Sequence, residues 1–321
     1  MIVMNSRFLH KTGAVIALFL MSMPLVAHAH APAQTFTEGG MGEGWWIWPL
    51  ALFFVSIAVG FLAVVSGTGG GVLFVPFVAG LFPFHLDFIR GTGLMVALCA
   101  ALAAGPGMLA RNMASLRLAI PFGLVASTAS IFGAMLGLAL PVNVVQFSMG
   151  ICIMVICVVM IRVHNADYPD LPGKDALAAA LSLNGLYTED SSGETIQWRV
   201  IRTPAGLCIF ALIGFLAGVF GIGGGWAMVP TLNLVMGAPL KLSVATGKII
   251  LGVTDTSAAW VYLNRGGIMA MIAVPSILGA MLGSAIGVRV FSRIKPKVIR
   301  WVVILALLLA GLRAIARGVG V

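Results

Sequence analysis

The pattern of hydrophobic and polar positions divides most of the chain into apolar segments separated by short polar turns. Two segments have only 12 or 13 residues, fewer than the ~20 that a straight transmembrane helix needs. Each of these two follows a glycine cluster, so it either crosses together with backbone from the glycine turn or re-enters without crossing. The segments predicted as helices are 45–65, 72–84, 91–110, 118–140, 144–161, 204–220, 226–237, 243–263, 268–290 and 298–315. The order long, short, long, long, long therefore occurs twice.

A sequence repeat relates the first half of this pattern to the second. Gly60–Pro76 reads GFLAVVSGTGGGVLFVP and Gly214–Pro230 reads GFLAGVFGIGGGWAMVP, so 11 of 17 positions are identical at an offset of 154 residues. A doubled structure with an interrupted helix in each half is typical of secondary transporters. We therefore expect an all-α polytopic membrane protein of two transmembrane repeats, 45–161 and 204–315, each with a glycine-interrupted helix and a short half-helix.

Basic residues near the segment ends predict how the repeats are oriented, because Lys and Arg favour cytoplasmic loops. The region before the first span carries Glu38 and Glu43 and is placed outside, whereas Arg111 and Arg117 place their loop inside, as do the arginines of the linker 162–203. If every segment crosses, each repeat crosses five times, and an odd number inverts the two repeats relative to each other. If the short segments re-enter, each repeat crosses four times and the repeats are parallel. The inverted arrangement is favoured.

Composition excludes a water-soluble protein. The 321 residues are 60% hydrophobic and 9% charged, against about 25% charged residues in a soluble domain. The net charge of +9 comes mainly from basic residues beside apolar segments, which indicates contact with anionic lipid headgroups and not with nucleic acid. Neither a cofactor nor a metal site is expected, since the four cysteines lie within apolar segments and form no CxxC pair.

Two regions outside the repeats have their own patterns. Residues 1–31 are typical of a cleaved signal peptide, because Arg7 and Lys11 precede an apolar run that ends in a small-x-small pattern; a retained extra helix is the alternative. The hydrophilic linker 162–203 is expected to be a cytoplasmic tether between the repeats, with a short surface helix at Ala176–Leu186.

The glycine clusters are the first candidate site. If the short segments are helices, their first N–H groups lack intrahelical partners and carry partial positive charge, and glycine lets an anion approach that backbone. Two clusters that meet between the repeats would form an anion-binding site, whereas tight helix crossing through small residues is the alternative. The predicted substrate-binding residues are Ser66, Gly67, Thr68, Gly69, Gly70, Gly71, Thr92, Gly221, Gly223, Gly224, Gly225, Thr246 and Lys248.

Segment 243–263 carries the two charges that are most clearly within a predicted span, Lys248 and Asp255. A charge at membrane depth costs about 3 kcal/mol on insertion scales, so each needs a partner or a function. Seven residues apart, the two lie on nearly the same helix face. Either they neutralise each other, directly or through Thr254 or water, or Lys248 attracts an anion and Asp255 carries a coupling proton. Leu94 and Ala101 stand at the corresponding positions of the first repeat.

These motifs resemble the sulfite exporter TauE/SafE family over roughly residues 50–315. The resemblance rests on a repeated G-x-G-G-G-x-x-x-V-P box and on a downstream Thr-Gly pair that leads to a helix ending near an arginine. The residues concerned are Gly67–Pro76, Gly221–Pro230, Thr92-Gly93, Thr246-Gly247, Arg111 and Arg265. The resemblance implies a multi-pass permease of the inner membrane, associated with sulfite, sulfonates and other organosulfur anions.

The expected function is secondary transport of a small anion, such as sulfite, a sulfonate or a related organosulfur anion, across the cytoplasmic membrane. Alternating access would move the anion, with Asp255 as the candidate for proton coupling. We do not expect an enzyme, because no histidine lies in a predicted span to activate a nucleophile. An anion channel and a non-transporting membrane partner of a sulfur or redox enzyme are the alternatives. The expected partners are the anionic substrate and the lipid bilayer, and homo-oligomer formation is left open.

Overall fold

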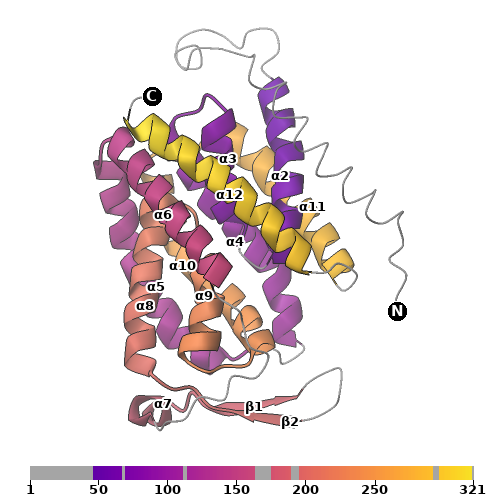
Figure 1. The fold of residues 1–321 in the computed structure, drawn as a ribbon, viewed down its shortest axis with the longest axis vertical. Coiled ribbons are helices and arrows are strands. Elements are labelled where there is room, and N and C mark those ends of the chain that lie inside the picture. The colour runs from indigo at the N-terminus through magenta and orange to yellow at the C-terminus, as the bar shows by residue number, and fades with distance from the viewer. Residues whose placement is uncertain are drawn as a thin grey trace.

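The computed structural model describes residues 46–66, 69–110, 114–162, 175–188, 195–291 and 296–319. They form a bundle of helices with a small β-hairpin below it (Figure 1). The predicted signal peptide, residues 1–31, lies outside the described residues. The elements are α2 (Ile47–Ser66), α3 (Gly70–Leu81), α4 (Leu86–Ala110), α5 (Leu116–Ala139), α6 (Val142–Arg162), α7 (Ala176–Ala180), β1 (Gly185–Thr188), β2 (Thr195–Trp198), α8 (Thr203–Phe220), α9 (Gly225–Pro230), the π-helix η2 (Thr231–Val235), α10 (Leu240–Asn264), α11 (Ala270–Phe291) and α12 (Pro296–Val319).

Each predicted apolar segment corresponds to a helix, and most boundaries agree within three residues. The largest difference is at α4, which begins at Leu86 and not at 91. Within the described residues, five helices are long and apolar enough to cross a membrane. The short segment 226–237 is not one regular helix: α9 ends at Pro230 and η2 continues it, because the proline ring removes a backbone donor and disturbs the α-helical pattern. The chain is thus an all-α membrane protein.

Small residues let pairs of helices pack at backbone distance. A Cβ placed on Gly283 of α11 would collide with the carbonyl oxygen of Ile57 in α2, and one on Gly218 of α8 would collide with that of Ser130 in α5. Gly133–Gly137 and Gly279–Gly283, which share the sequence GAMLG, both lie in these contacts. Both copies therefore serve helix packing, since only glycine allows such an approach.

The central pair of helices, α4 and α10, contact each other and run in opposite directions. At one end of the pair, the amide of Ser115, which follows α4, donates to Thr246 near the start of α10 at 3.1 Å. At the other end, His85 before α4 and Arg265 after α10 line the same pocket. We call the end that carries α7 and the hairpin the linker end, and the opposite end the far end.

The linker is a folded element packed against the bundle, not a simple tether. The predicted helix Ala176–Leu186 is wrong beyond Ala180: α7 has five residues, and β1 begins at Gly185 and pairs antiparallel with β2. Trp198 is only 5% exposed. It belongs to the same apolar cluster as Leu232 in η2 and Met236, which directly follows η2. The amide of Ile201 donates to the carbonyl oxygen of Met236 at 2.9 Å. Burial of these side chains holds the linker against the bundle.

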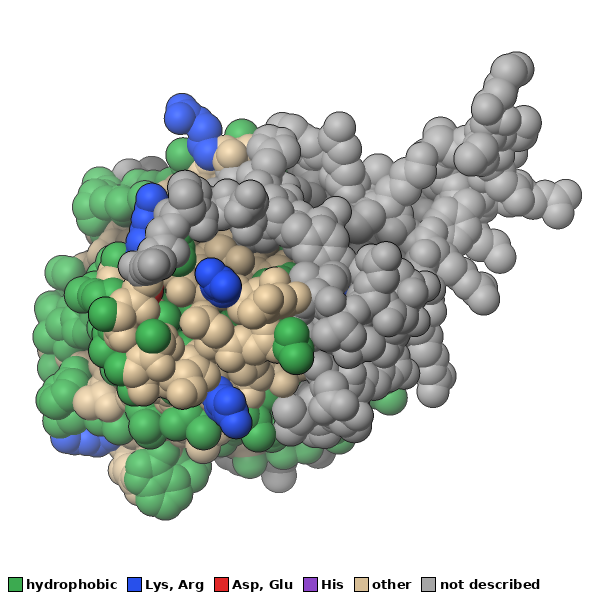
Figure 2. Space-filling view, turned by 90° about the horizontal axis from the view of Figure 1, so that it is seen from below, with side chains coloured by type: hydrophobic (Ala, Val, Ile, Leu, Met, Phe, Trp, Pro, Cys, Tyr) green, Lys and Arg blue, Asp and Glu red, His purple; other side chains and the backbone are tan. Residues whose placement is uncertain are grey.

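The linker end has a different surface from the sides of the bundle. Figure 2 views this end and shows Lys and Arg side chains scattered over it, with hydrophobic side chains gathered along one edge. Exposed apolar residues on the bundle sides include Phe132, Trp260 and Leu305, each more than 60% exposed. Such a large exposed apolar surface is expected where lipid replaces water as the solvent.

Candidate functional site

Both short helices begin at a glycine box, which we define as Gly67–Gly71 for the first box and Gly221–Gly225 for the second. The backbone needs glycine there, because Gly69 has φ +90° and both Gly221 and Gly223 have φ +68°, a region that residues with a Cβ rarely adopt. The N-cap glycines, Gly69 and Gly224, make no side-chain capping hydrogen bond. In α9 the amide of Ala227 donates to the carbonyl oxygen of Gly224 at 3.2 Å. Because the first N–H groups of a helix have no acceptor four residues earlier within it, both helix starts carry partial positive charge.

The two boxes lie against each other. A Cβ placed on Gly71 would be 2.6 Å from the carbonyl oxygen of Ile222, and one placed on Gly69 would be 3.6 Å from the Cα atom of Gly225. A side chain at Gly71 would push the boxes apart, whereas the Gly69 position is in ordinary van der Waals contact with Gly225. The structure thus brings together the two clusters that are 154 residues apart in sequence.

The middle parts of α4 and α10 flank the boxes. A Cβ on Gly70 would lie 3.2 Å from Val96 Cγ1 in α4, and a Cβ on Gly223 would lie 3.3 Å from Ala97 Cβ. On the α10 side, a Cβ placed on Gly223 would lie 3.1 Å from Oδ2 of Asp255. Each repeat therefore contributes one glycine box and one helix, α4 or α10, to the region where the boxes meet.

Asp255 is the most unusual residue of this site. Its side chain is 0% exposed, and neither carboxylate oxygen has a hydrogen-bond partner. The backbone carbonyl of the preceding Thr254 accepts a hydrogen bond from Ser130 of α5 at 3.1 Å, which holds this turn of α10 in place. A buried carboxylate without a partner is costly, so its retention favours a role beyond packing.

Lys248 does not neutralise Asp255 by direct contact. It is half-buried, and no ion pair joins it to Asp255 within the part of the chain that the structure describes. The hydroxyl of Thr254 is buried without a hydrogen-bond partner, so it does not bridge the two charges either. The two charges interact only at longer range along α10. The structure therefore contradicts two forms of the neutralising pair that the sequence suggested, direct contact and a bridge through Thr254.

The remaining predicted site residues are placed differently. Thr92 is fully buried in α4 beside the second box, and its hydroxyl has no partner. Thr246 accepts the hydrogen bond from Ser115, which gives its oxygen a structural role at the linker end. Gly224 faces side chains of Ile213 and Met228 and not the first box. Gly67, Thr68 and the side chain of Ser66 lie outside the described residues.

A second charged cluster was missed from the sequence, because His85, Asp87 and Arg90 fall between the predicted helices 72–84 and 91–110. Since α4 already begins at Leu86, Asp87 and Arg90 belong to the helix, and Arg90 points into the bundle with its side chain 1% exposed. Its guanidinium donates to the carbonyl oxygens of Gly137 and Val219 and pairs with Asp87. The i, i+3 spacing of Asp87 and Arg90, next to an apolar segment, was the signal that could have revealed this pair.

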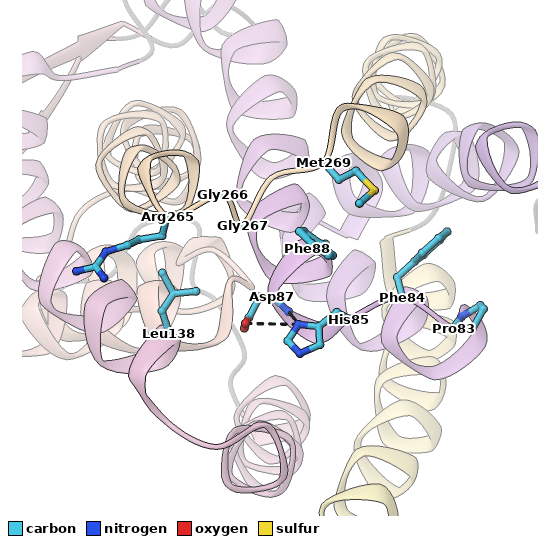
Figure 3. A pocket seen from close by; sticks show the side chains of 10 residues that line it. All are labelled: Pro83, Phe84, His85, Asp87, Phe88, Leu138, Arg265, Gly266, Gly267 and Met269. Carbon is cyan, nitrogen blue, oxygen red and sulfur yellow. Dashed lines mark hydrogen bonds and ion pairs between the residues drawn. The ribbon is translucent and has the colours of Figure 1, made fainter. Parts of the chain in front are cut away.

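A pocket of about 470 Å³ opens at the far end beside this cluster. Phe84, Phe88 and Met269 lie toward one side of it, and Leu138 and Arg265 toward the other (Figure 3). His85 and Asp87 lie between them, with His85 Nδ1 3.5 Å from Asp87 Oδ2. The guanidinium of Arg265 points away from both (Figure 3).

Comparison with known proteins agrees with this architecture. The model of the family described as sulfite exporter TauE/SafE matches residues 52–314. The probable membrane transporter protein YunE of Bacillus subtilis is 23% identical over 275 residues, which cover 84% of this chain and 97% of the relative. A probable membrane transporter protein of Sinorhizobium, ORF9, is 23% identical over 268 residues, covering 83% and 91%. One of Methanocaldococcus jannaschii is 24% identical over 264 residues, covering 78% and 88%. No solved structure matches the chain.

Proposed function

The chain belongs to the sulfite exporter TauE/SafE family of membrane proteins, and from this starting point we propose that it is a secondary transporter of a small anion, such as sulfite, a sulfonate or a related organosulfur anion. Membrane transport follows from the family and its relatives. The anion class, movement by alternating access across the cytoplasmic membrane and proton coupling are our proposal.

The observation that carries the proposal is the placement of Asp255 against the meeting point of the two boxes. The partial positive charge at the starts of α3 and α9 favours an anion, while a carboxylate at the same place repels it unless a proton is bound. An anion that enters this volume therefore favours protonation of Asp255. This linkage is the physical basis of anion and proton cotransport in the proposed mechanism.

Alternating access is proposed to come from two repeats inverted relative to each other. The opposite directions of α4 and α10 support this arrangement, as do the contacts of α6 with α12, where Phe147 lies against Gly318 and Ile153 against Gly311. In this arrangement the linker end is cytoplasmic and the far end is external, as the arginines of the linker and of the loop after α4 predict, whereas Arg265, Arg313 and Arg317 lie at the far end and count against it. Rocking one repeat against the other would expose the boxes to each side in turn.

A flux assay on the full chain in proteoliposomes tests the proposal. Sulfite, sulfate, thiosulfate and methanesulfonate are offered separately, with and without a pH gradient. We expect saturable flux of at least one of these four anions, accelerated by the gradient, and loss of that acceleration in Asp255→Asn. Lys248→Gln should weaken the apparent affinity for the anion. Thr256→Ala is the matched control, because Thr256 follows Asp255 but is exposed and bonds only to the carbonyl of Gly252.

The outcomes separate the proposal from its alternatives. Unchanged flux in both charge variants would remove Asp255 and Lys248 from the mechanism. Unitary currents would identify a channel in place of a carrier. Absence of flux for all four anions in inserted protein would refute anion transport of this class.

A further inference from the structure

The charged cluster at the far end carries an inference that rests on the proposed function and deepens it. We propose that Arg90 is a second anion-binding residue, reached from the far-end pocket, and that Asp87 occupies its binding position until an oxyanion displaces it. In this arrangement Asp87 is a tethered substitute for the transported anion.

Arg90 has the chemistry for such a site. Its Nη1 atom donates to Gly137 O at 3.1 Å and to Val219 O at 2.9 Å, and its Nη2 atom donates to Gly137 O at 3.0 Å and to Asp87 Oδ1. The Nε atom is buried and has no partner. A planar guanidinium with a donor to spare matches the geometry of a small oxyanion.

Asp87 supplies the only full negative charge that contacts Arg90 among the described residues. The carbonyl groups carry partial charge only, as ends of α5 and α8. Because an unpaired charge inside the bundle is costly, Asp87 leaves Arg90 readily only when another anion takes its place. The pair therefore favours exchange of one anion for another over simple opening.

Asp87 also connects Arg90 to the pocket. Its side chain is 27% exposed and lines the pocket, whereas that of Arg90 is 1% exposed and lies behind it. The pocket volume of about 470 Å³ has room for a small oxyanion in front of Asp87. His85 also lines the pocket beside Asp87, with its Nδ1 atom 3.5 Å from the second carboxylate oxygen (Figure 3).

Arg90 is also adjacent to the central site. A Cβ placed on Gly221, the first glycine of the second box, would lie 2.6 Å from the Cα atom of Arg90. Thr92, with its buried free hydroxyl, follows two residues later on α4. The backbone of Arg90 therefore lies against the second box, while its pair partner Asp87 lines the far-end pocket.

The competing explanation is that Arg90 has a structural role only and holds the ends of α5 and α8 together through its hydrogen bonds. Tyr262 provides the control for this explanation, because its ring lies 5.5 Å from the guanidinium carbon and its hydroxyl donates to Gly218 O at 3.1 Å. Tyr262→Phe removes a hydrogen bond to the end of α8 but keeps the aromatic ring and every charge. Asp87→Asn keeps Arg90 and its three carbonyl hydrogen bonds but removes the competing charge.

The experiment measures equilibrium binding of radiolabelled thiosulfate to the full chain in lipid nanodiscs, with methanesulfonate as unlabelled competitor. We expect Asp87→Asn to bind thiosulfate about tenfold more tightly than the wild type, since the anion no longer has to displace a carboxylate from its charge-assisted hydrogen bond with Arg90. Tyr262→Phe should bind like the wild type. Adding Arg90→Lys to Asp87→Asn should abolish the gain, because a point charge does not reproduce the guanidinium fork.

Equal affinity of wild type and Asp87→Asn, in protein that still transports thiosulfate in proteoliposomes, would overturn the Arg90 site and leave the proposed function intact. A gain that survives Arg90→Lys would also overturn it. Failure of the wild type both to bind and to transport any anion of the panel would refute the proposed function, and this inference with it. The decisive comparison needs only Asp87→Asn, so it does not depend on an Arg90 variant that folds.

Discussion

The two halves of the chain share a glycine box and a following helix, but they place their charges differently. In the first half, α4 carries Asp87 and Arg90 near its start, at the far end. In the second half, α10 carries Asp255 near its middle, and the position that corresponds to Arg90 at the repeat offset is Val244. Duplication thus accounts for the backbone that both halves share, whereas the charges differ between them.

This difference separates two physical roles. The boxes depend on the absence of side chains, so both halves must keep glycine for the backbones to meet. Charges are costly inside the bundle, and one copy of each is sufficient when the two halves meet around a common centre. Asp255 without a partner and Arg90 with several are two different solutions to the placement of a buried charge.

The largest effect is expected where the halves are alike. Gly71→Ala places a methyl group 2.6 Å from the carbonyl oxygen of Ile222 and 3.1 Å from that of Gly93, so the two boxes must separate. We expect a loss of about 1–3 kcal/mol in stability together with loss of flux. Thermal unfolding in detergent and proteoliposome flux measure both. Gly252→Ala is the control, because a Cβ there meets nothing within 4 Å; equal behaviour of the two variants would contradict a tight contact between the boxes.

The next effect tests the asymmetry of charge. Asp255→Ala makes α10 resemble α4, where Ala101 stands at the corresponding position, and removes an unsatisfied buried carboxylate. We expect the unfolding midpoint to rise, by about 1 kcal/mol in stability, while the response of flux to a pH gradient is lost. The converse variant, Ala101→Asp, should cost about 3 kcal/mol. A lower midpoint for Asp255→Ala would show that a favourable partner had stabilised the carboxylate.

The smallest effect concerns the junction between the halves. Asp175 caps α7 by accepting from the amides of Leu177 and Ala178, and it also accepts from the amide of Thr203 at the start of α8. Burial alone would raise the pKa of this carboxyl, but the hydrogen bonds, with that of Thr203 foremost, outweigh it and hold the pKa below its ordinary value. The carboxylate therefore stabilises the fold fully above its unfolded pKa of about 4, and this contribution is lost as pH falls through the lower folded pKa.

Asp175→Ala should cost about 1 kcal/mol at neutral pH, as loss of a helix cap does. The difference in unfolding midpoint between wild type and variant should shrink as the pH falls below about 4. Asn184→Ala is the control, since Asn184 accepts from the amide of Val200 at 3.0 Å but does not titrate. A cost that is constant with pH for Asp175→Ala would show that its charge is unimportant.

Much of the fold could be predicted because it depends on local patterns. Hydrophobic run length located the helices, since burial in lipid requires it. The early start of α4 was missed, because the charged residues between the predicted segments 72–84 and 91–110 were assigned to a turn. The linker hairpin was also missed, because strands of four residues carry little periodicity and are held by burial of Trp198.

The candidate site was predicted in its composition more than in its geometry. The glycine boxes and Asp255 were singled out from residue type and position, and the structure places Asp255 beside the second box. The sequence left open whether Lys248 and Asp255 contact each other; no ion pair joins them among the described residues, because two residues on one helix face can still be two turns apart. The burial of Arg90 was missed because its partners, Gly137 and Val219, lie 47 and 129 residues away.

By itself, the sequence determined that this chain spans a membrane and that each half contains a glycine interruption, because apolar run length and the absence of a Cβ are properties of single segments. Only the tertiary structure decided that the boxes touch each other, that Asp255 is without a partner and that Arg90 is buried. These are properties of contacts between distant segments, and packing of the whole bundle determines which polar groups meet and which do not.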